Sequence, residues 1–328
     1  MSQNTVLEIK DLEVELFSEQ GPLPVIDKVN LSIKEGEIVG IVGESGCGKS
    51  MLASAIMNLL NSPAQIAAGT IFYEGQDMTT LSSKEFQKIR GNEISMIFQE
   101  PMTSLNPLMK VGKQIEEAIK AHEKVTNAEL KERAIAAIRE VGIPQPEKVY
   151  HDIPSRLSGG MRQRIMIAMA LVCHPKLLIC DEPTTALDVT IQAQILRLIK
   201  KLRDETNTAV IFISHDMGVI YQMVDRVVVM YAGQFVESAP CKKLFEKPLH
   251  PYTIGLQNAI PQINKQQSSL QDIPGSVPML DNLPEGCLFA PRCPFAKAEC
   301  FTKKVPLKQY DDHDVRCLLV DEGGWHNE

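Results

Sequence analysis

The segment Gly43–Ser50, which reads GESGCGKS, constrains the fold of this chain more than any other. It has the spacing of a phosphate-binding loop, in which backbone N–H groups close around phosphate oxygens. The motif requires a strand before the loop and a helix after it, and the apolar runs Ile38–Val42 and Met51–Leu60 predict both. A glycine-rich turn that binds nothing would not need this context. The segment therefore predicts a parallel α/β sheet with a phosphate site at its edge.

The fixed positions of this loop each have a chemical role. Lys49 is expected to reach the β- and γ-phosphates of a nucleotide, and the Ser50 hydroxyl is expected to ligate Mg²⁺. The helix that begins there adds the partial positive charge of its N-terminus. The residues expected to contact the nucleotide are Gly43, Ser45, Gly46, Gly48, Lys49, Ser50 and Met51.

A second set of candidate residues follows an apolar run. Leu177–Glu182 predicts a buried strand that ends in two carboxylates. The C-terminal end of a parallel strand lies beside the phosphate site, so Asp181 is expected to hold Mg²⁺ through its water shell. Glu182 is expected to polarise the attacking water as a general base. An acidic turn without chemistry would be an equal interpretation of this segment alone, and the phosphate loop favours the catalytic one.

Bulk properties limit the cellular setting. With 328 residues, the chain can form two domains or one large α/β domain with an appendage. Its formal net charge of −7 argues against a nucleic-acid partner. It has no apolar run as long as a membrane span, and its first residues do not resemble a signal peptide. We therefore expect a cytosolic chain whose eight cysteines are reduced or metal-bound.

The composition also predicts boundaries. Alternating residues 6–17 predict an edge strand, and helical spacing dominates from 84 to 175, for example in Ala128–Val141. Residues 262–284 are rich in Gln, Ser, Asn and Pro and predict a linker. The predicted parts are an ATPase domain at 1–261 with a helical subdomain at about 100–176, the linker, and an extension at 285–328.

One motif points to a known family. Leu157–Gln163 reads LSGGMRQ and resembles the signature of ATP-binding cassette (ABC) proteins, between the phosphate loop and the acidic strand as in that family. Met161 stands where Gln is usual, a variation that the peptide-importer branch tolerates. The resemblance implies that Ser158, Gly159 and Gly160 contact the γ-phosphate of an ATP held by a partner subunit. An isolated monomer should therefore be nearly inactive.

The resemblance assigns four more residues. Gln99 matches the Q-loop glutamine that meets Mg²⁺ and the attacking water, and Asp188 matches the D-loop at the dimer interface. His215 follows the strand Val210–Ser214 and matches the switch histidine that contacts the γ-phosphate, although alone it would suggest a packing histidine. Phe17 is the candidate for stacking on adenine, the alternative being a strand residue that faces the core.

A narrower resemblance is to the ATPase subunits of bacterial dipeptide and oligopeptide importers, with nickel importers as close relatives. It is carried by Glu100–Pro107, by His250–Thr253 and by the cysteine-containing tail. The segment after Gln99 resembles the surface that receives a coupling helix from a membrane subunit. For His250–Thr253 we expect packing and assign no chemical role.

The tail holds four cysteines, with five, six and sixteen residues between them. Zinc sites usually use closely spaced pairs, whereas this irregular spacing fits thiolates around an iron–sulfur cube at least as well. Arg292 is expected to offset part of the thiolate charge. The resemblance implies a 4Fe–4S cluster, and zinc or no metal are the alternatives. The expected ligands are Cys287, Cys293, Cys300 and Cys317.

The resemblance as a whole implies an ABC-type nucleotide-binding domain, with a P-loop parallel-sheet core, an antiparallel β edge, a helical subdomain and a small cysteine-ligated extension. Its implied function is the ATP-hydrolysing motor of a peptide importer that uses ATP and Mg²⁺. The implied partners are an identical or homologous ATPase, two membrane permeases and an extracytoplasmic solute-binding protein, with no nucleic acid. The chain would lie peripherally on the cytoplasmic face of the inner membrane.

Three alternatives remain open. They are an importer of nickel or another small solute, a soluble ABC ATPase that acts on DNA or ribosomes, and the motor of an exporter. DNA-repair relatives insert long coiled coils between the phosphate loop and the signature, and too few residues lie there in this chain. Ribosome-acting relatives usually carry two cassettes, and one is found here.

Overall fold

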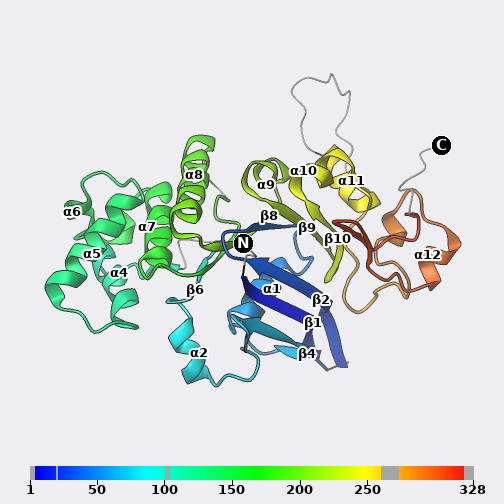
Figure 1. Ribbon diagram of the computed structural model, residues 1–328, viewed down its shortest axis with the longest axis horizontal. Helices are drawn as coiled ribbons and strands as arrows, with labels where there is room; N and C mark the ends of the chain where they lie inside the picture. The colour runs from blue at the N-terminus through cyan, green and yellow to red at the C-terminus, as the bar shows by residue number, and fades with distance from the viewer. Residues whose placement is uncertain (1–3, 20, 100–103, 186, 260–272, 321–328) are drawn as a thin grey trace. The chain divides into compact units, whose positions relative to one another are not determined.

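The computed structural model describes residues 4–19, 21–99, 104–185, 187–259 and 273–320 (Figure 1). The chain forms two compact units, each assembled from segments that are distant in the sequence. The first unit contains the described residues of 1–7, 33–37 and 73–211, and the second contains those of 8–32, 38–72 and 212–328.

The second unit contains the strand that leads into the phosphate loop. This strand, β3 (Ile38–Val42), is buried along its whole length and confirms the predicted bounds. It runs parallel to β9 (Arg226–Tyr231), with Val39 opposite Arg226 and Val42 opposite Val229. Both strands are rich in Val and Ile, as expected for parallel strands covered on both faces. The loop therefore leaves the C-terminal end of a rigid, buried strand.

The cysteine-containing tail adds strands next to this parallel pair. Strand β10 (Gln234–Pro240) is antiparallel to β9, β12 (His313–Val315) is antiparallel to β10, and β11 (Lys308–Tyr310) is antiparallel to β12. Figure 1 shows the tail beside β10. Buried apolar residues secure the junction, namely Leu249, Val315, Cys317 and Val320. The tail is thus joined to the sheet that carries the phosphate loop. The domain boundaries predicted from composition stay predictions. Residues 262–272 of the predicted linker lie outside the described residues.

A separate sheet corrects one prediction. Strand β1 (Thr5–Ser18) lies between β2 (Gly21–Lys34) and β4 (Ala64–Tyr73), and β5 (Gln76–Asp77) follows β4. The prediction that residues 6–17 form an edge strand is therefore wrong. Alternation of apolar and polar residues reports one buried face, and it carries no information about the number of neighbouring strands.

The first unit contains the acidic strand and a group of helices. Strand β7 (Leu177–Asp181) runs parallel to β6 (Ile94–Ile97), and β8 (Ala209–Ser214) begins in this unit. Helices α4, α5 and α7 pack on one another (Figure 1), and α5 confirms the helix predicted from spacing. The helical elements described in this unit are α2 (Ser83–Ile89), α4 (Val111–Lys120), α5 (Asn127–Glu140), α6 (Pro146–Val149), η1 (Pro154–Arg156), α7 (Gly159–Leu171) and α8 (Val189–Thr206).

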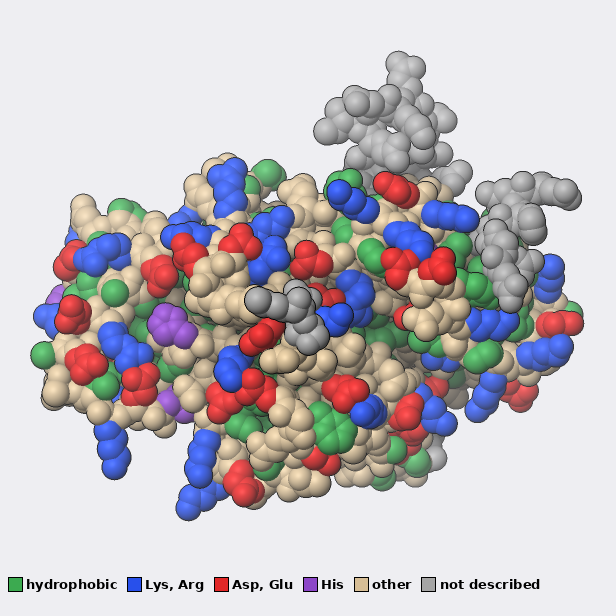
Figure 2. Space-filling view, in the orientation of Figure 1, with side chains coloured by type: hydrophobic (Ala, Val, Ile, Leu, Met, Phe, Trp, Pro, Cys, Tyr) green, Lys and Arg blue, Asp and Glu red, His purple; other side chains and the backbone are tan. Residues whose placement is uncertain are grey.

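Short helices surround the strands of the second unit. Its described helical elements are α1 (Lys49–Ile56), α9 (Met217–Met223), α10 (Cys241–Glu246), α11 (Pro251–Asn258), η2 (Ala290–Arg292) and α12 (Ala298–Thr302). Within the described ranges, no helix has both the length and the apolar character needed to cross a membrane. Acidic and basic side chains are interspersed over the face drawn in Figure 2.

One buried carboxylate holds the start of α11 against β10. The register shift in β10 between Phe235 and Glu237 turns the Glu237 side chain inward, where it is fully buried. Its oxygens accept hydrogen bonds from Leu249 N at 2.6 Å and His250 N at 2.9 Å, and His313 Nε2 lies 2.6 Å away. A single side chain thus connects β10, the α11 start and β12.

We predict that Glu237→Ala destabilises the protein by on the order of 3–5 kcal/mol, because it leaves buried donors without an acceptor. The measurement is the urea midpoint followed by circular dichroism. Glu205→Ala is the control, because Glu205 is exposed and pairs with the exposed Lys201 at 3.7 Å, and a change of at most about 0.5 kcal/mol is expected. Equal midpoints for the two variants would contradict the structural role of Glu237.

Candidate nucleotide site

The phosphate loop is shaped by its glycines. A Cβ on Gly43 would lie 2.2 Å from the Met230 carbonyl oxygen, so only glycine fits against β9 at this point. Gly48 precedes the first residue of α1 and has a φ of 108°, a conformation that glycine adopts without strain. The loop therefore turns sharply between β3 and α1, which places the helix N-terminus at the predicted phosphate position.

Lys49 is folded back over this loop. Its side chain is almost fully buried, and Nζ donates to the carbonyl oxygens of Gly43 and Glu44, both at 2.8 Å. Burial raises the pKa of the Cys47 thiol, and the nearby Lys49 ammonium offsets part of that effect. Ser45, Gly46 and Ser50 are exposed, and Met51 is half-buried. The loop thus presents Ser45, Gly46 and Ser50 to solvent, while Gly43 and Lys49 are buried.

Two other predicted residues of the second unit are exposed. His215 directly follows β8, and the next residue, Asp216, caps α9 by accepting from Gly218 N and Val219 N. Phe17 lies near the end of β1 with 48% of its surface exposed, so it does not face the core. Both side chains are exposed, and their assigned roles stay predictions.

The acidic strand brings two predicted residues together. Asp181 ends β7 and is buried, and Glu182 follows with a φ of 47°. This positive φ strains a residue that has a side chain, and such strain is often retained at functional sites. Glu182 Oε2 accepts from Gln99 Nε2 at 3.0 Å and from Thr185 Oγ1 at 2.9 Å. Sequence reasoning did not select Thr185, whose only signal is its place three residues after the carboxylate.

The signature segment forms the start of α7. Ser158 precedes the helix, and its Oγ accepts from Met161 N at 3.3 Å, which is a helix cap. Gly159 is exposed, and a Cβ added to it would meet nothing within 4 Å. Gly160 is closer to a neighbour, because a Cβ there would lie 3.1 Å from Ile191 Cγ2. The segment therefore offers an open surface to an incoming group.

Two further residues connect the elements around the acidic strand. Asp188 caps α8 by accepting from Ile191 N at 3.0 Å, while Ala186 of the predicted D-loop lies outside the described residues. Gln163 is buried on α7 and donates from Nε2 to the Pro183 carbonyl at 2.7 Å. Sequence reasoning missed this role of Gln163, although a polar residue on an apolar helix was a usable signal.

Comparison with known proteins identifies the family. Residues 26–185 match the ABC transporter family, and residues 236–300 match the C-terminal region of oligopeptide/dipeptide transporters. The oligopeptide transport ATP-binding protein AppD of Bacillus subtilis is 49% identical over 323 residues, which are 98% of this chain and 98% of that protein. The chain belongs to the ABC transporter family. The predicted ABC-type nucleotide-binding fold and the predicted ATPase are confirmed.

Other relatives of this ABC ATPase agree with that conclusion. The dipeptide transport ATP-binding protein DppD of Escherichia coli is 45% identical over 321 residues, covering 97% of this chain and 98% of that protein. The dimeric post-hydrolysis structure of the ATP-binding cassette MJ0796, bound to ADP and Pi, is 28% identical with a TM-score of 0.65. The match covers 72% of this chain and 98% of that one. The predicted resemblance to peptide-importer ATPases is thus confirmed.

The four tail cysteines of this ABC ATPase line one small cavity of about 10 Å³, together with residues of the α11 start. Burial raises the pKa of Cys293 to about 11 and that of Cys317 to about 12, and the neighbouring thiols add to the shift. Across the described ranges, no group of three or more His, Cys, Asp or Glu is arranged to hold a metal ion. Four convergent thiols suit a soft metal chemically, yet the geometry does not support a metal-ligated extension.

Arg292 of the tail does not pair with the cysteines. Arg292 was expected to offset the thiolate charge, but its guanidinium lies 2.7 Å and 2.9 Å from the two carboxylate oxygens of Glu44 instead. A carboxylate is a stronger partner for a guanidinium than a thiol is, and burial raises the pKa of the Cys293 and Cys317 thiols, which disfavours their thiolate forms. Glu100–Pro107, the predicted coupling surface, lies partly outside the described residues.

Proposed function

We propose that this chain is the ATP-hydrolysing subunit of an importer of dipeptides or oligopeptides. The observation that carries the proposal is similarity over nearly the whole chain to proteins named oligopeptide and dipeptide transport ATP-binding proteins. The match includes residues 236–300, which correspond to the C-terminal region of oligopeptide/dipeptide transporters. We expect it to act peripherally on the cytoplasmic face of the inner membrane.

In this proposal the phosphate loop binds MgATP. Lys49 Nζ donates hydrogen bonds to two loop carbonyl oxygens in the structure. When ATP binds, Lys49 would donate hydrogen bonds to the β- and γ-phosphates in place of some of these. The Ser50 hydroxyl would ligate Mg²⁺, and Asp181 would hold it through water. Ser45, Gly46, Gly48 and Met51 would complete the phosphate contacts around the start of α1, and Phe17 would stack on adenine.

Hydrolysis would depend on Glu182. Its carboxylate would take a proton from the attacking water, which requires that the carboxylate be oriented and ionised. The hydrogen bonds from Gln99 and Thr185 to Glu182 Oε2 support this assignment, because they orient the carboxylate. His215 would contact the γ-phosphate, and this contact would be lost when the γ-phosphate is cleaved.

We further propose that two ATPase subunits complete each other's sites. The exposed Ser158–Gly160 segment at the start of α7 would bind the γ-phosphate of an ATP held by the partner. Asp188 would lie at the subunit interface. The partner would be a second copy or a homologue, and the two ATPases would drive two permeases. An extracytoplasmic solute-binding protein would deliver the solute to these permeases.

We also propose the four-cysteine cavity as a binding site for a soft metal centre. The 4Fe–4S cluster is the first candidate and zinc the second, and Cys287, Cys293, Cys300 and Cys317 would be the ligands. The support is the convergence of four thiols on one cavity, whose volume of about 10 Å³ requires the lining to open around a cluster. Such a centre would fix the tail, whose small apolar content gives limited burial.

The transport function can be tested directly. The tagged chain would be purified from membranes of its own host, and the proteins that copurify would be identified and placed in liposomes. Copurified permeases and ATP-dependent uptake of a labelled dipeptide would support the proposal. Uptake of Ni²⁺ instead of peptide, or copurification of nucleic acid or ribosomes without permeases, would overturn it.

We predict that Glu182→Gln lowers ATP turnover of the assembled transporter by on the order of 10²–10⁴, because the amide cannot take a proton. Nucleotide binding should be retained, since the substitution preserves shape and hydrogen bonding. Phosphate release measures turnover, and Glu205→Gln on an exposed face of α8 is the matched control. Near-normal turnover in Glu182→Gln would exclude this residue as the base.

We predict opposite defects for two variants of the nucleotide site. Gly159→Asp introduces a carboxylate into open space, so it should fold normally and bind ATP while blocking ATP-driven dimer formation. Lys49→Ala should lose ATP affinity itself. A fluorescent ATP analogue measures binding, and light scattering measures dimers. If monomeric Gly159→Asp lost ATP binding, the proposal of shared sites would fail.

We predict about four irons per chain in protein purified without oxygen, with brown colour that Cys293→Ser abolishes. Cys241→Ser is the control, because Cys241 is buried in α10 and does not line the cavity. Metal content is measured by elemental analysis. About one zinc per chain would replace the iron–sulfur assignment, and metal-free protein with an ordered tail would reject both.

A further inference from the structure

Every polar group of Glu44, the second residue of the phosphate loop, has a partner. Its N–H donates to the Tyr252 hydroxyl at 2.8 Å, and its carbonyl oxygen accepts from Lys49 Nζ at 2.8 Å. Its carboxylate forms two parallel hydrogen bonds with Arg292, at 2.7 Å and 2.9 Å. Tyr252 and Arg292 belong to the C-terminal part of the chain, so the loop is held from outside by that region.

The Arg292 guanidinium is fixed in one orientation. Its side chain is 5% exposed, and Nε donates to the Pro274 carbonyl at 2.9 Å. It also lies against the rings of Tyr231 and Phe289, with its central carbon 5.7 Å and 5.9 Å from their centroids. A planar fork held in this way can bind a carboxylate in only one position, which fixes Glu44.

Tyr252 is equally constrained. It is fully buried, and its ring packs edge-on against Tyr231 at 4.7 Å between centroids. Its N–H donates to His250 Nδ1 at 3.1 Å, and the backbone just before it is anchored by the buried Glu237. The segment His250–Thr253, expected from the sequence only to pack, therefore also directs a hydroxyl group at the phosphate loop.

Charge gives the Arg292 contact a second consequence. Glu44 places a negative side chain beside glycines whose N–H groups are expected to receive phosphates. An unpaired carboxylate there would repel a triphosphate, and it would compete for Lys49 and the loop N–H groups. The buried guanidinium neutralises that carboxylate, and because the pair is partly buried, solvent screens it less than an ion pair on the open surface.

We propose that Arg292 is a positioning residue for nucleotide binding, acting through Glu44 with the help of Tyr252. It keeps the phosphate loop in its binding conformation and cancels the Glu44 charge. This inference rests on the proposed nucleotide site and adds the C-terminal region to it. The region thereby sets the affinity for ATP without contacting the nucleotide.

The test compares ATP binding by full-length variants, using a fluorescent ATP analogue with Mg²⁺. Arg292→Met should weaken binding on the order of tenfold, since a charged hydrogen-bond partner is lost. In the assembled transporter the KM for ATP should rise by a similar factor, with kcat changing by less than about twofold. Adding Glu44→Gln to Arg292→Met should restore binding to within about threefold of the unmodified protein, because the repelling charge is gone.

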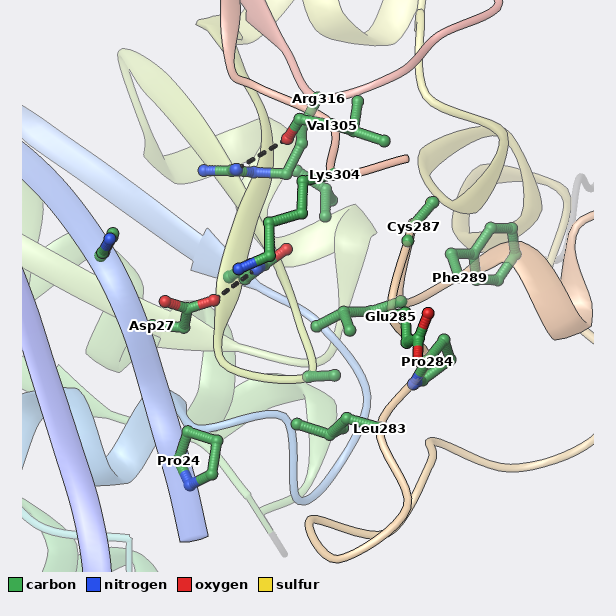
Figure 3. A pocket seen from close by; sticks show the side chains of 16 residues that line it. Pro24, Asp27, Leu283, Pro284, Glu285, Cys287, Phe289, Lys304, Val305 and Arg316 are labelled. Carbon is green, nitrogen blue, oxygen red and sulfur yellow. Dashed lines mark hydrogen bonds between the residues drawn. The ribbon is translucent and has the colours of Figure 1, made fainter. Parts of the chain in front are cut away.

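Arg316→Met is the matched control. Arg316 is another partly buried arginine of the tail, and it donates to the carbonyls of Phe235 at 3.1 Å and Val305 at 2.9 Å. It lines a separate cavity of about 310 Å³ beside Asp27 and Lys304 (Figure 3) and makes no hydrogen bond to the phosphate loop among the contacts described. Its loss should disturb the tail and leave ATP affinity unchanged.

Tyr252→Phe tests the same idea when Arg292→Met does not fold. It removes one hydroxyl while keeping the ring packing, and binding should weaken about threefold to tenfold. Unchanged affinity in Arg292→Met or Tyr252→Phe, or equal defects in Arg292→Met and the double variant, would overturn the positioning role. Lys49→Ala separates the proposed nucleotide site from the proposed positioning role of Arg292. If Lys49→Ala loses ATP binding, the nucleotide site is upheld, even where the Arg292 and Tyr252 variants bind ATP normally. Binding that Lys49→Ala does not weaken would overturn both.

Discussion

A loop that binds phosphate through its backbone must be held in shape from outside, because its glycines offer almost no side chains to pack. Three supports meet this requirement here. The Met230 carbonyl approaches Gly43 so closely that no Cβ fits. The ammonium group of Lys49 donates hydrogen bonds to two carbonyl oxygens of the loop. Glu44 is bound by Arg292 and Tyr252. Two of these supports come from the adjoining strand and helix, while the third comes from the C-terminal region.

The tail is consequently tied to the ATPase sheet by two carboxylates, the fully buried Glu237 and the partly buried Glu44. Glu237 binds backbone N–H groups at the start of α11 and lies against His313 of β12, and Glu44 binds Arg292. In both cases the acid belongs to the sheet-bearing part of the chain and most donors come from residues after 248. Strand pairing between β10 and β12 adds to this connection. The cysteine cavity lies among the same elements, so the tail forms a continuous packed structure with the strand that carries the loop.

The sequence predicted features that depend on neighbours along the chain. β3, the glycine loop and the carboxylates at the end of β7 follow from apolar runs and fixed spacing, whereas the hydrogen bond from Gln99 to Glu182 was not predicted. Contacts between distant segments were not predictable, because any buried Arg could pair with any acid. Arg292 was therefore assigned to the thiols, and β1 was placed at an edge. The caps formed by Ser158 and Asp188 were also missed, since the motif assigned those side chains to a ligand.

The distance along the chain between Glu44 and its partners bears on biosynthesis. Tyr252 follows it by 208 residues and Arg292 by 248. At the usual rate of about 5–20 residues per second, the ribosome needs roughly 12–50 s to reach Arg292 after making Glu44. During that interval the glycine loop exists without its external support. The nascent chain therefore cannot form the supported loop until Arg292, near the start of the tail, has emerged, which places completion of the loop late in synthesis.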